Sequence, residues 1–207
     1  MTDRRIPRDL TEMLSPSSTA LIMWDFQIGL GGNAANLDSI VDAAARLLQG
    51  ADDAGVPVIW SRHTVPHLAQ VTAGSLYRMM KKQGVSERAE VSPFMQVGSP
   101  EREFLPQLNP RPHDTIIDKS APSFFVGTPL EMRLRAMGVD SLVFCGVATD
   151  IGIDLSAKHA SALGYFPIVA EDAVGSYSED RHLAALAAMR SWIPISDSTS
   201  IIEVWKA

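Results

Sequence analysis

Polar side chains stand at the ends of several apolar runs of this chain, where a parallel sheet would gather them at one edge. Asp25 directly follows the run 20–24, and Lys119 lies just after the run 114–117. The other polar residues at run ends are Arg62, His63, Thr149 and Asp172. In parallel sheets, ligands bind outside the carboxyl ends of the strands. Because a carboxylate can exchange protons with a substrate or with water, the pattern nominates Asp25 and Lys119 as site residues.

Residues 143–154 form a second candidate element. The run 142–147 is short, apolar and β-branched, which predicts a strand buried on both faces. Thr149 and Asp150 are residue types that cap helices, and the helix predicted after them extends to Gly164. Its predicted buried face carries Ile151, Leu155, His159 and Ala162. A strand that turns directly into a helix points backbone N–H groups at the sheet edge, which suits an oxyanion; an ordinary strand–helix junction explains the same pattern equally well.

Composition restricts the class of protein. The 207 residues are enough for one well-cored domain, and 46% hydrophobic with 20% charged residues is typical of a soluble globular protein. A net charge of −6 without a basic run argues against nucleic acid as a partner. The single cysteine excludes intramolecular disulfides and a cysteine-based metal cluster. With no secretory signal and no apolar run of about 18 residues, we expect a cytoplasmic protein without a membrane partner.

Strand and helix patterns alternate along the chain, which predicts an α/β fold with three layers, α/β/α, around a mostly parallel, six-stranded sheet. Strands are expected at residues 20–24, 56–60, 114–117, 142–147, 166–170 and 201–204. Further helices are expected at 37–49, around 75–83, at 128–137 and at 178–192. The helix after Thr128 is predicted from the spacing of a capping box, with Pro129 at the first helical position.

The domain organisation is expected to be simple. Residues 1–18 resemble an arm that is frayed or packed on a neighbouring subunit, and residues 19–207 form one domain. Residues 64–112 are rich in proline and glycine, and a structureless loop of this length is uncommon in a compact domain. We therefore expect local helix there, in an excursion that acts as a lid or contacts another subunit.

Three motifs in this order resemble the isochorismatase-like hydrolase superfamily, which includes nicotinamidases, N-carbamoylsarcosine amidohydrolases and isochorismatases. The motifs are Trp24-Asp25-Phe26-Gln27, then Lys119 followed by Ser123, Phe125, Gly127 and Thr128, and then Gly146-Val147-Ala148-Thr149-Asp150. Gly164-Tyr165 and Glu171-Asp172-Ala173 fit the segment that follows them. Each motif alone is weak, but their order and spacing are specific, and the resemblance extends over residues 19–190.

The resemblance implies roles for individual residues. Asp25 would be the proton-transfer carboxylate, and Lys119 its cationic partner. The family's non-proline cis peptide would fall between Val147 and Ala148, and would help to point the amides of residues 148–152, Thr149 among them, at a substrate oxygen. His63 and Phe125 would contact the substrate, although core filling explains Phe125 equally well. The family is usually oligomeric, so a homodimer or homotetramer is expected.

No metal and no cofactor are implied. His63 and His67 are four residues apart, but the metal-binding members carry an aspartate-containing motif before their histidines, and Ser61-Arg62 does not supply it.

Gly152 departs from the amidase members, which carry a cysteine nucleophile at this position. The only cysteine, Cys145, lies inside a predicted core strand, so the thioester route of the amidases is unavailable. A glycine here resembles the isochorismatase branch instead. In that branch the aspartate protonates a vinyl ether carbon, and water captures the resulting oxocarbenium ion without a covalent enzyme intermediate.

Two points stay open at this level. Burial would favour a protonated Asp25, as a general acid needs, whereas contact with Lys119 would favour the anion and a general base. The Ala148-Thr149-Asp150 sequence after Gly-Val also follows the amidases rather than the siderophore-type isochorismatases. Cations for a dicarboxylate substrate are available at Arg62, Arg78, Lys81, Lys82 and Arg88, although a solvated surface explains each of them as well.

Three interpretations follow from these residues. The first is a hydrolase without a cysteine nucleophile, acting on a vinyl ether or another small substrate that water can attack. The second is a non-catalytic member that binds a small anion or amide. The third is an amidase whose nucleophile has been lost at Gly152. Retention of Asp25 with Lys119 favours the first interpretation over the second, because a binding protein does not need that pair.

Overall fold

The computed structural model of this chain describes residues 6–207. Its centre is a six-stranded, all-parallel sheet with the strand order β3-β2-β1-β4-β5-β6. The strands are β1 (Thr19–Trp24), β2 (Val58–His63), β3 (Thr115–Lys119), β4 (Ser141–Val147), β5 (Phe166–Gly175) and β6 (Ile195–Ser196). The prediction of a parallel α/β fold is confirmed, because strands buried on both faces are continuously apolar and require crossover helices.

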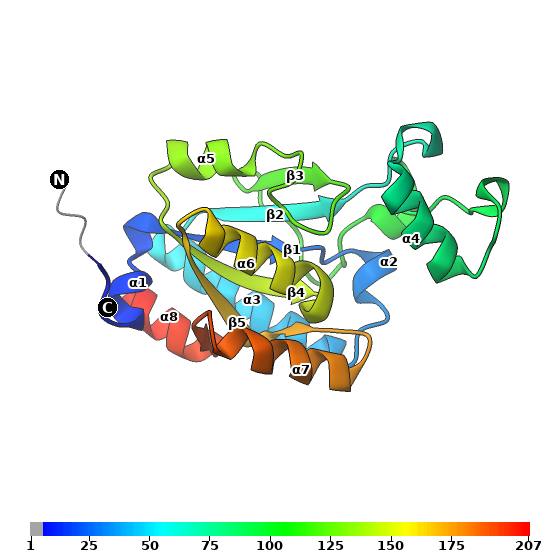
Figure 1. Cartoon of the computed structure of the whole chain (residues 1–207). Coiled ribbons are helices and arrows are strands. Elements are labelled where there is room, and N and C mark those ends of the chain that lie inside the picture. Colours follow the sequence, from blue (N-terminus) through cyan, green and yellow to red (C-terminus); the bar gives the residue numbers. More distant parts are fainter. Residues whose placement is uncertain (1–5) are drawn as a thin grey trace.

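Helices cover both faces of the sheet (Figure 1). One face carries α3 (Leu37–Ala54) and α8 (Ser198–Lys206), and the other carries α5 (Leu130–Ala136), α6 (Asp154–Ala162) and α7 (Glu179–Arg190). Alternate side chains of β1 supply the two cores: Met23 packs on the α3 side, and Ile22 and Trp24 pack on the α6 side. Short helices α1 (Leu10–Met13) and α2 (Ile28–Gly31) flank β1 in the chain.

The expected strand at residues 201–204 is wrong, because these residues lie inside α8 and the sixth strand is the two-residue β6. The Asp197 side chain accepts a hydrogen bond from the Ser200 N–H at 2.9 Å and caps the helix. Ile201 and Trp205, one helical turn apart, are buried in the core that includes α3. A run of four apolar or charged residues is too short for its periodicity to separate strand from helix.

Two other helix details differ from the predictions. Pro129, not Thr128, is the N-cap of α5, and the Thr128 hydroxyl instead donates to the Phe124 carbonyl and accepts from the Leu130 N–H. The helix after β4 begins with a π-helical turn, Thr149–Ile153, before α6. The wider turn changes the helical phase, so the buried side chains there are Ile153, Ser156, Ala157 and Ala160. The face predicted from Ile151 and Leu155 is wrong, since these side chains are 48% and 46% exposed.

The segment 64–112 leaves the sheet at its carboxyl edge and returns to it (Figure 1). It holds α4 (Ala73–Gln83), which agrees with the helix expected around 75–83, and three 3₁₀ turns, Leu68–Gln70, Arg88–Glu90 and Pro100–Arg102. A small apolar cluster of its own, with Val65, Met79, Val91 and Met95 buried at its centre, holds α4 in place. The excursion therefore forms a separate lobe over one end of the sheet.

The N-terminal residues that the structure describes pack on their own domain. Leu14 is fully buried in the core beside α3 and α8, and Leu10 and Met13 pack against the same cluster. Residues 1–5 of the expected arm lie outside the described residues. Within residues 6–207, no helix is both long and apolar enough to cross a membrane.

Candidate active site

Asp25 and Lys119 meet at the carboxyl edge of the sheet. Lys119 Nζ lies 2.6 Å from Asp25 Oδ2, and both residues are buried, each with 4% of its surface exposed. The strand between them, β2, supplies Ser61, whose hydroxyl donates to Asp25 Oδ1 and accepts the Asp25 backbone N–H at 3.0 Å. The ammonium group and the hydroxyl together stabilise a carboxylate at this position.

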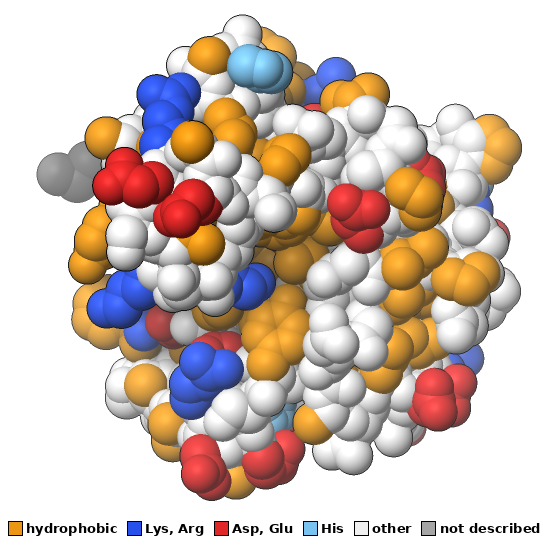
Figure 2. Space-filling model, turned by 90° about the vertical axis from the view of Figure 1, so that its right-hand side faces the viewer, with side chains coloured by type: hydrophobic (Ala, Val, Ile, Leu, Met, Phe, Trp, Pro, Cys, Tyr) orange, Lys and Arg blue, Asp and Glu red, His pale blue; other side chains and the backbone are white. Residues whose placement is uncertain are grey.

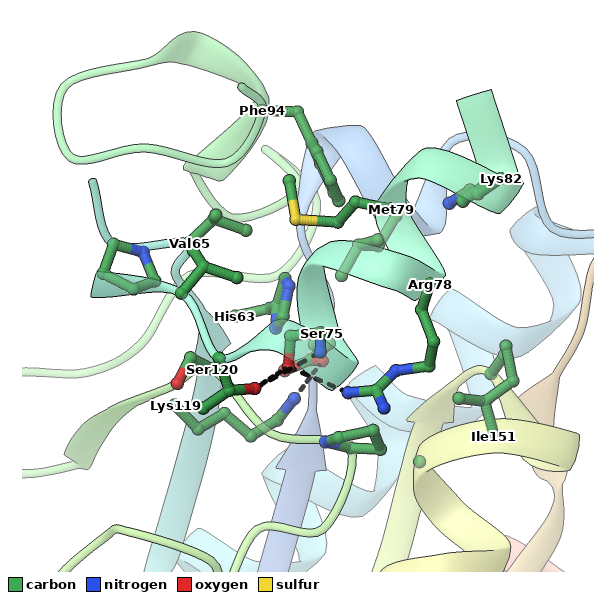
Figure 3. A pocket seen from close by; sticks show the side chains of 18 of the residues that line it. His63, Val65, Ser75, Arg78, Met79, Lys82, Phe94, Lys119, Ser120 and Ile151 are labelled. Atoms are coloured by element: carbon green, nitrogen blue, oxygen red, sulfur yellow. Dashed lines mark hydrogen bonds and ion pairs between the residues drawn. The ribbon is translucent and has the colours of Figure 1, made fainter. Parts of the chain in front are cut away.

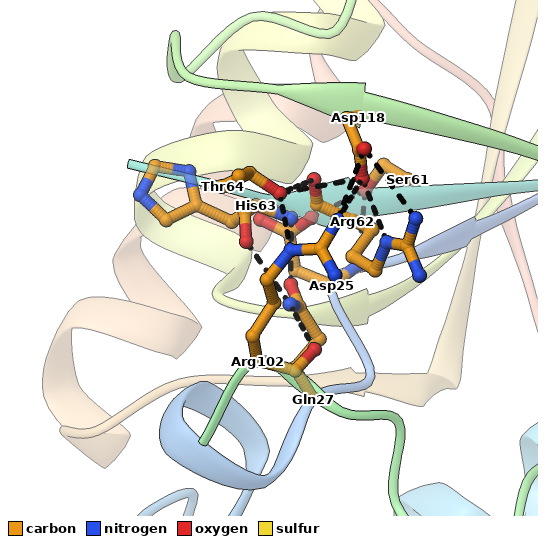
Figure 4. Close-up of polar contacts among 8 residues, drawn as sticks. All are labelled: Asp25, Gln27, Ser61, Arg62, His63, Thr64, Arg102 and Asp118. Carbon is orange, nitrogen blue, oxygen red and sulfur yellow. Dashed lines mark hydrogen bonds and ion pairs between the residues drawn. The ribbon is translucent and has the colours of Figure 1, made fainter. Parts of the chain in front are cut away.

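A glutamine two residues after Asp25 fixes the neighbouring strand end. The Gln27 side chain accepts the His63 N–H at 2.6 Å and donates to the carbonyls of His63 and Arg102, at 3.0 and 2.6 Å (Figure 4). Arg62 does not join the site; with Arg102 it binds Asp118 instead, at 2.7 and 3.0 Å. This network fixes the backbone of β2 at His63, next to the strand end that carries Asp25.

A cavity opens between the sheet edge and the lobe formed by residues 64–112. Figure 2 looks onto this edge, where the surface is hollowed and hydrophobic side chains line the hollow. From the sheet edge, the cavity is lined by Trp24, Asp25, His63, Lys119, Val147, Ala148, Ile151, Gly152 and Tyr177. From the lobe it is lined by Ser75, Arg78, Met79, Lys82 and Phe94, which face the sheet-edge residues (Figure 3).

In the segment 147–153 the cis peptide bond is where it was expected, but some backbone N–H groups bind within the segment itself. The Val147–Ala148 peptide bond is cis, at the position that the resemblance implied. The Ala148 carbonyl accepts the N–H groups of Ile151, Gly152 and Ile153 at 3.1–3.3 Å. The amides of residues 151 and 152 therefore bind within the turn. For these two amides, the structure differs from the prediction that they point at a substrate oxygen.

Two predicted substrate contacts lie away from the cavity. Thr149 is fully buried and its hydroxyl bonds to His182 Nδ1 at 2.9 Å, so its contact is within the fold. Phe125 stacks on Tyr165 at 6.1 Å between ring centroids, and it is absent from the residues, all within the described part of the chain, that line the cavity. Asp172, another strand-end candidate, accepts from the N–H and the hydroxyl of Ser198, the first residue of α8, so its contacts are within the fold.

Gly152 lies against the indole of Trp24. A Cβ atom at residue 152 would stand 2.2 Å from Trp24 Cζ2 and 2.4 Å from Nε1, distances that no side chain adopts. The indole is held in turn by an edge-to-face contact with Phe124, 5.7 Å between centroids. The space in which the amidase members carry their cysteine side chain is therefore filled by a tryptophan ring.

Strand phase points Trp24 away from Asp25 and into the core, but it does not predict that the large ring also lines the cavity. Cys145 offers no replacement nucleophile. It is fully buried, its thiol lies 3.2 Å from Met23 Sδ, and burial raises the pKa of the thiol far above its ordinary value.

Burial determines the charge of the remaining polar groups. It lowers the pKa of Lys119, and the carboxylate of Asp25 opposes that shift. Burial, together with the nearby charge of Lys119, lowers the pKa of His63 from 6.5 to about 4, so the imidazole is neutral at pH 7. Burial and the negative charges of Asp25 and Asp150 raise the pKa of Tyr177 to about 12, which keeps its hydroxyl a hydrogen-bond donor. Sequence reasoning missed Tyr177, because nothing in its local pattern marks a residue after the fifth strand as part of this site.

Comparisons with known proteins agree with this architecture. The isochorismatase domain matches residues 19–200. A protein of Escherichia coli O157:H7 described as uncharacterized isochorismatase family protein YecD is 30% identical over 172 residues, which cover 82% of this chain and 86% of that protein. A probable isochorismatase of Pseudomonas chlororaphis is 29% identical over 188 residues, covering 89% of this chain and 85% of that protein. The crystal structure of a cysteine hydrolase from Pseudomonas syringae superposes with a TM-score of 0.79, at 23% identity, covering 98% of this chain and 96% of that one, which shows the shared fold.

The contact between Gly152 and Trp24 leads to a prediction about stability. Gly152→Ala should lower the free energy of unfolding by about 1–3 kcal/mol or more, because the added methyl group overlaps a ring that is packed on its other side. Gly74→Ala is the control, since a Cβ there meets nothing closer than 3.9 Å. Urea unfolding of both variants measures the difference. Equal stability of Gly152→Ala and wild type would show that the indole moves aside easily.

The depressed pKa of His63 leads to a prediction about pH. Between about pH 6.5 and pH 4 the unfolded chain binds a proton at this residue that the folded protein excludes, so folding stability should fall as the pH drops through that range. The loss is on the order of 2–3 kcal/mol, and His63→Gln should remove it. Urea unfolding at pH 7 and pH 4.5 tests this, with the exposed His113→Gln as the variant that keeps the wild-type dependence.

Proposed function

The chain belongs to the isochorismatase family, and we propose that it hydrolyses a small anionic vinyl ether, such as isochorismate, without a covalent enzyme intermediate. The observation that carries the proposal is the combination of a buried Asp25–Lys119 pair with a tryptophan ring in the space of a nucleophile. A proton-transfer group is present at this site, whereas a thiolate is not.

The ion pair supplies the proton that the reaction needs. Lys119 Nζ and Asp25 Oδ2 are 2.6 Å apart, so one proton can move from the ammonium to the carboxylate without changing the net charge of the buried site. Burial lowers the pKa of Lys119, which favours that transfer. The protonated carboxyl group of Asp25 then acts as a general acid. Whether Asp25 is an acid or a base therefore depends on which of the two residues, Asp25 or Lys119, carries the shared proton.

The chemical steps balance with water as the only co-reactant. Asp25 protonates the terminal carbon of the vinyl ether, and the double-bond electrons form the new C–H bond, leaving an oxocarbenium ion. Water adds to the cationic carbon and gives its proton to Asp25. The resulting hemiketal then breaks its C–O bond as its hydroxyl proton passes to the departing oxygen, which releases an alcohol and a keto acid. His63, neutral and lining the cavity, can accept a hydrogen bond from the attacking water.

The charge of the cavity favours an anionic substrate. Among the described residues that line it, Asp25 is the only carboxylate, and the cations are Arg78, Lys82 and Lys119. Arg78 is held toward the cavity by a hydrogen bond from its Nη2 to Ser75 Oγ at 2.9 Å. An arginine can bind a carboxylate through two parallel hydrogen bonds. The α4 cations thus suit the carboxylate groups of an isochorismate-like substrate.

Two observations weigh against the alternatives. A protein that only binds a ligand does not need to bury a carboxylate with an ammonium group, because that arrangement is costly unless it is used. An amidase that had merely lost its cysteine would retain space for the thiol beside Gly152, and Trp24 occupies that space. The probable isochorismatase of Pseudomonas chlororaphis supports the substrate class by its similarity.

Loss of the proton-transfer carboxyl should abolish turnover. In Asp25→Asn, kcat for isochorismate should fall about 10²–10⁴-fold, because an amide keeps the shape but cannot give or take the proton. Asp118→Asn is the matched control, since its carboxylate lies one residue from Lys119 but pairs with Arg62 and Arg102. Turnover of a panel of vinyl ethers and small amides measures both variants. Wild type that hydrolyses amides but no vinyl ether would refute the proposed substrate class.

Removal of the α4 guanidinium should weaken substrate binding. Arg78→Met should raise KM for an anionic vinyl ether about 10–100-fold with a smaller change in kcat, because a charge-assisted hydrogen bond contributes about 1.5–3 kcal/mol. Lys81→Met removes the same charge from an exposed position of the same helix outside the cavity lining, and should leave KM near the wild-type value. Equal effects of the two substitutions would assign the change to net charge alone.

A further inference from the structure

We propose that Trp24 is a positioning residue for Lys119: the face of its indole ring holds the lysine ammonium group, in its charged form, against Asp25. This role deepens the proposed function, because the pair that Trp24 supports is the one assigned to proton transfer. The role itself concerns the protonation of Lys119, which can be measured without any substrate.

The contacts of the ammonium group carry the inference. Lys119 Nζ lies 4.0 Å from the centroid of the Trp24 ring, well within the distance at which a cation is attracted to an aromatic face. Its two oxygen neighbours are Asp25 Oδ2 at 2.6 Å and the Ala121 carbonyl at 3.4 Å. An ammonium group has three donors and no acceptor. The indole face therefore takes the place of a third oxygen acceptor.

This contact matters because the lysine is almost fully removed from water. Only 2% of the Lys119 side chain is exposed, and burial lowers its pKa. A cation–π contact is strongest at such desolvated sites and favours the charged form. Trp24 thus opposes the effect of burial, together with Asp25, and keeps a proton on the pair near neutral pH.

The packing around the ring explains why it can do this. The Trp24 indole has 2% of its surface exposed and meets Phe124 edge to face. Gly152 is the neighbour without a side chain that leaves room for it, since any Cβ there would overlap the ring. The tryptophan and the glycine therefore form one unit, in which the glycine allows the ring to lie beside Lys119.

Each element around the cavity contributes other charged or titratable groups near Lys119. None of these residues is substituted in the variants of Trp24. They are Asp25 after β1, His63 on β2, Tyr177 after β5, and Arg78 and Lys82 on α4. Asp118, next to Lys119 on β3, is held by Arg62 and Arg102. A change in Lys119 protonation on substitution of Trp24 then reports the ring itself.

The test compares three variants by two readouts. Trp24→Leu removes the aromatic face, Trp24→Phe keeps a smaller one, and Trp60→Leu removes the same volume from the opposite core, where the ring contacts Phe104 and not Lys119. The Lys119 titration is followed by NMR of the protein labelled with ¹³C at lysine Cε, and its signal is assigned by its absence from Lys119→Arg. The pH dependence of kcat/KM is measured in parallel, and circular dichroism checks folding.

In Trp24→Leu, the titration midpoint of Lys119 should fall by about 0.5–1.5 pH units, and the basic limb of the kcat/KM profile should move down with it. The sign follows because the ring stabilises the protonated form, so its removal lets the proton leave at lower pH. Trp24→Phe should give a smaller shift in the same direction, and Trp60→Leu none. A folded Trp24→Leu with an unshifted midpoint, or an equal shift in Trp60→Leu, would overturn the proposal.

Fluorinated tryptophan provides a test that preserves the packing, should Trp24→Leu fail to fold. Ring fluorination reduces the negative potential of the aromatic face with little change in shape, so the Lys119 midpoint in labelled wild-type protein should also fall. An unchanged midpoint in that protein would refute the role of Trp24. Because the titration needs no turnover, a shifted midpoint without vinyl ether hydrolysis would leave this inference standing and refute only the proposed function.

Discussion

The ion pair between Asp25 and Lys119 is the interaction on which the rest of the site depends. Two opposite charges buried together lose their hydration, and the loss is recovered only where further polar contacts satisfy both groups. Here the neighbouring strand supplies the Ser61 hydroxyl, a backbone carbonyl supplies an acceptor, and the Trp24 ring supplies a negative face. The strand order β3-β2-β1 makes this possible, because only β2 separates the two strand ends and the Lys119 side chain reaches across it to Asp25.

A second constraint is one of volume. The space beside residue 152 can hold a nucleophile's side chain or a neighbouring indole, but not both, since a Cβ there would lie 2.2 Å from the Trp24 ring. A side chain at residue 152 therefore depends on the residue at position 24 as well. With Gly152 and Trp24 together, the site offers a substrate the Asp25–Lys119 pair and no nucleophilic side chain at residue 152. In the following turn, the amides of Ile151, Gly152 and Ile153 are bound to the Ala148 carbonyl.

The proposed substrate-binding cations and the proton-transfer groups come from different parts of the chain and line one cavity. The lobe formed by residues 64–112 has its own small apolar cluster around Met79 and Met95, and places Arg78 and Lys82 over the cavity. Elements that connect strands can change with little effect on the sheet that supports them. In the proposed function, the sheet edge therefore supplies the proton-transfer groups, and the lobe supplies the cations that would bind an anionic substrate.

The sequence by itself determined the parallel sheet, the placement of Asp25 and Lys119 at its carboxyl edge and the absence of a thiolate at Gly152, because strand periodicity and residue type are local properties. It did not determine α8, because residues 201–204 fit either a strand or a helix by their pattern, and their packing on α3 selects the helix. It also could not place Thr149 inside the fold, or the Trp24 ring beside Gly152. Those outcomes depend on the helical phase after a π turn and on how far a large ring extends, and only close packing in three dimensions sets both.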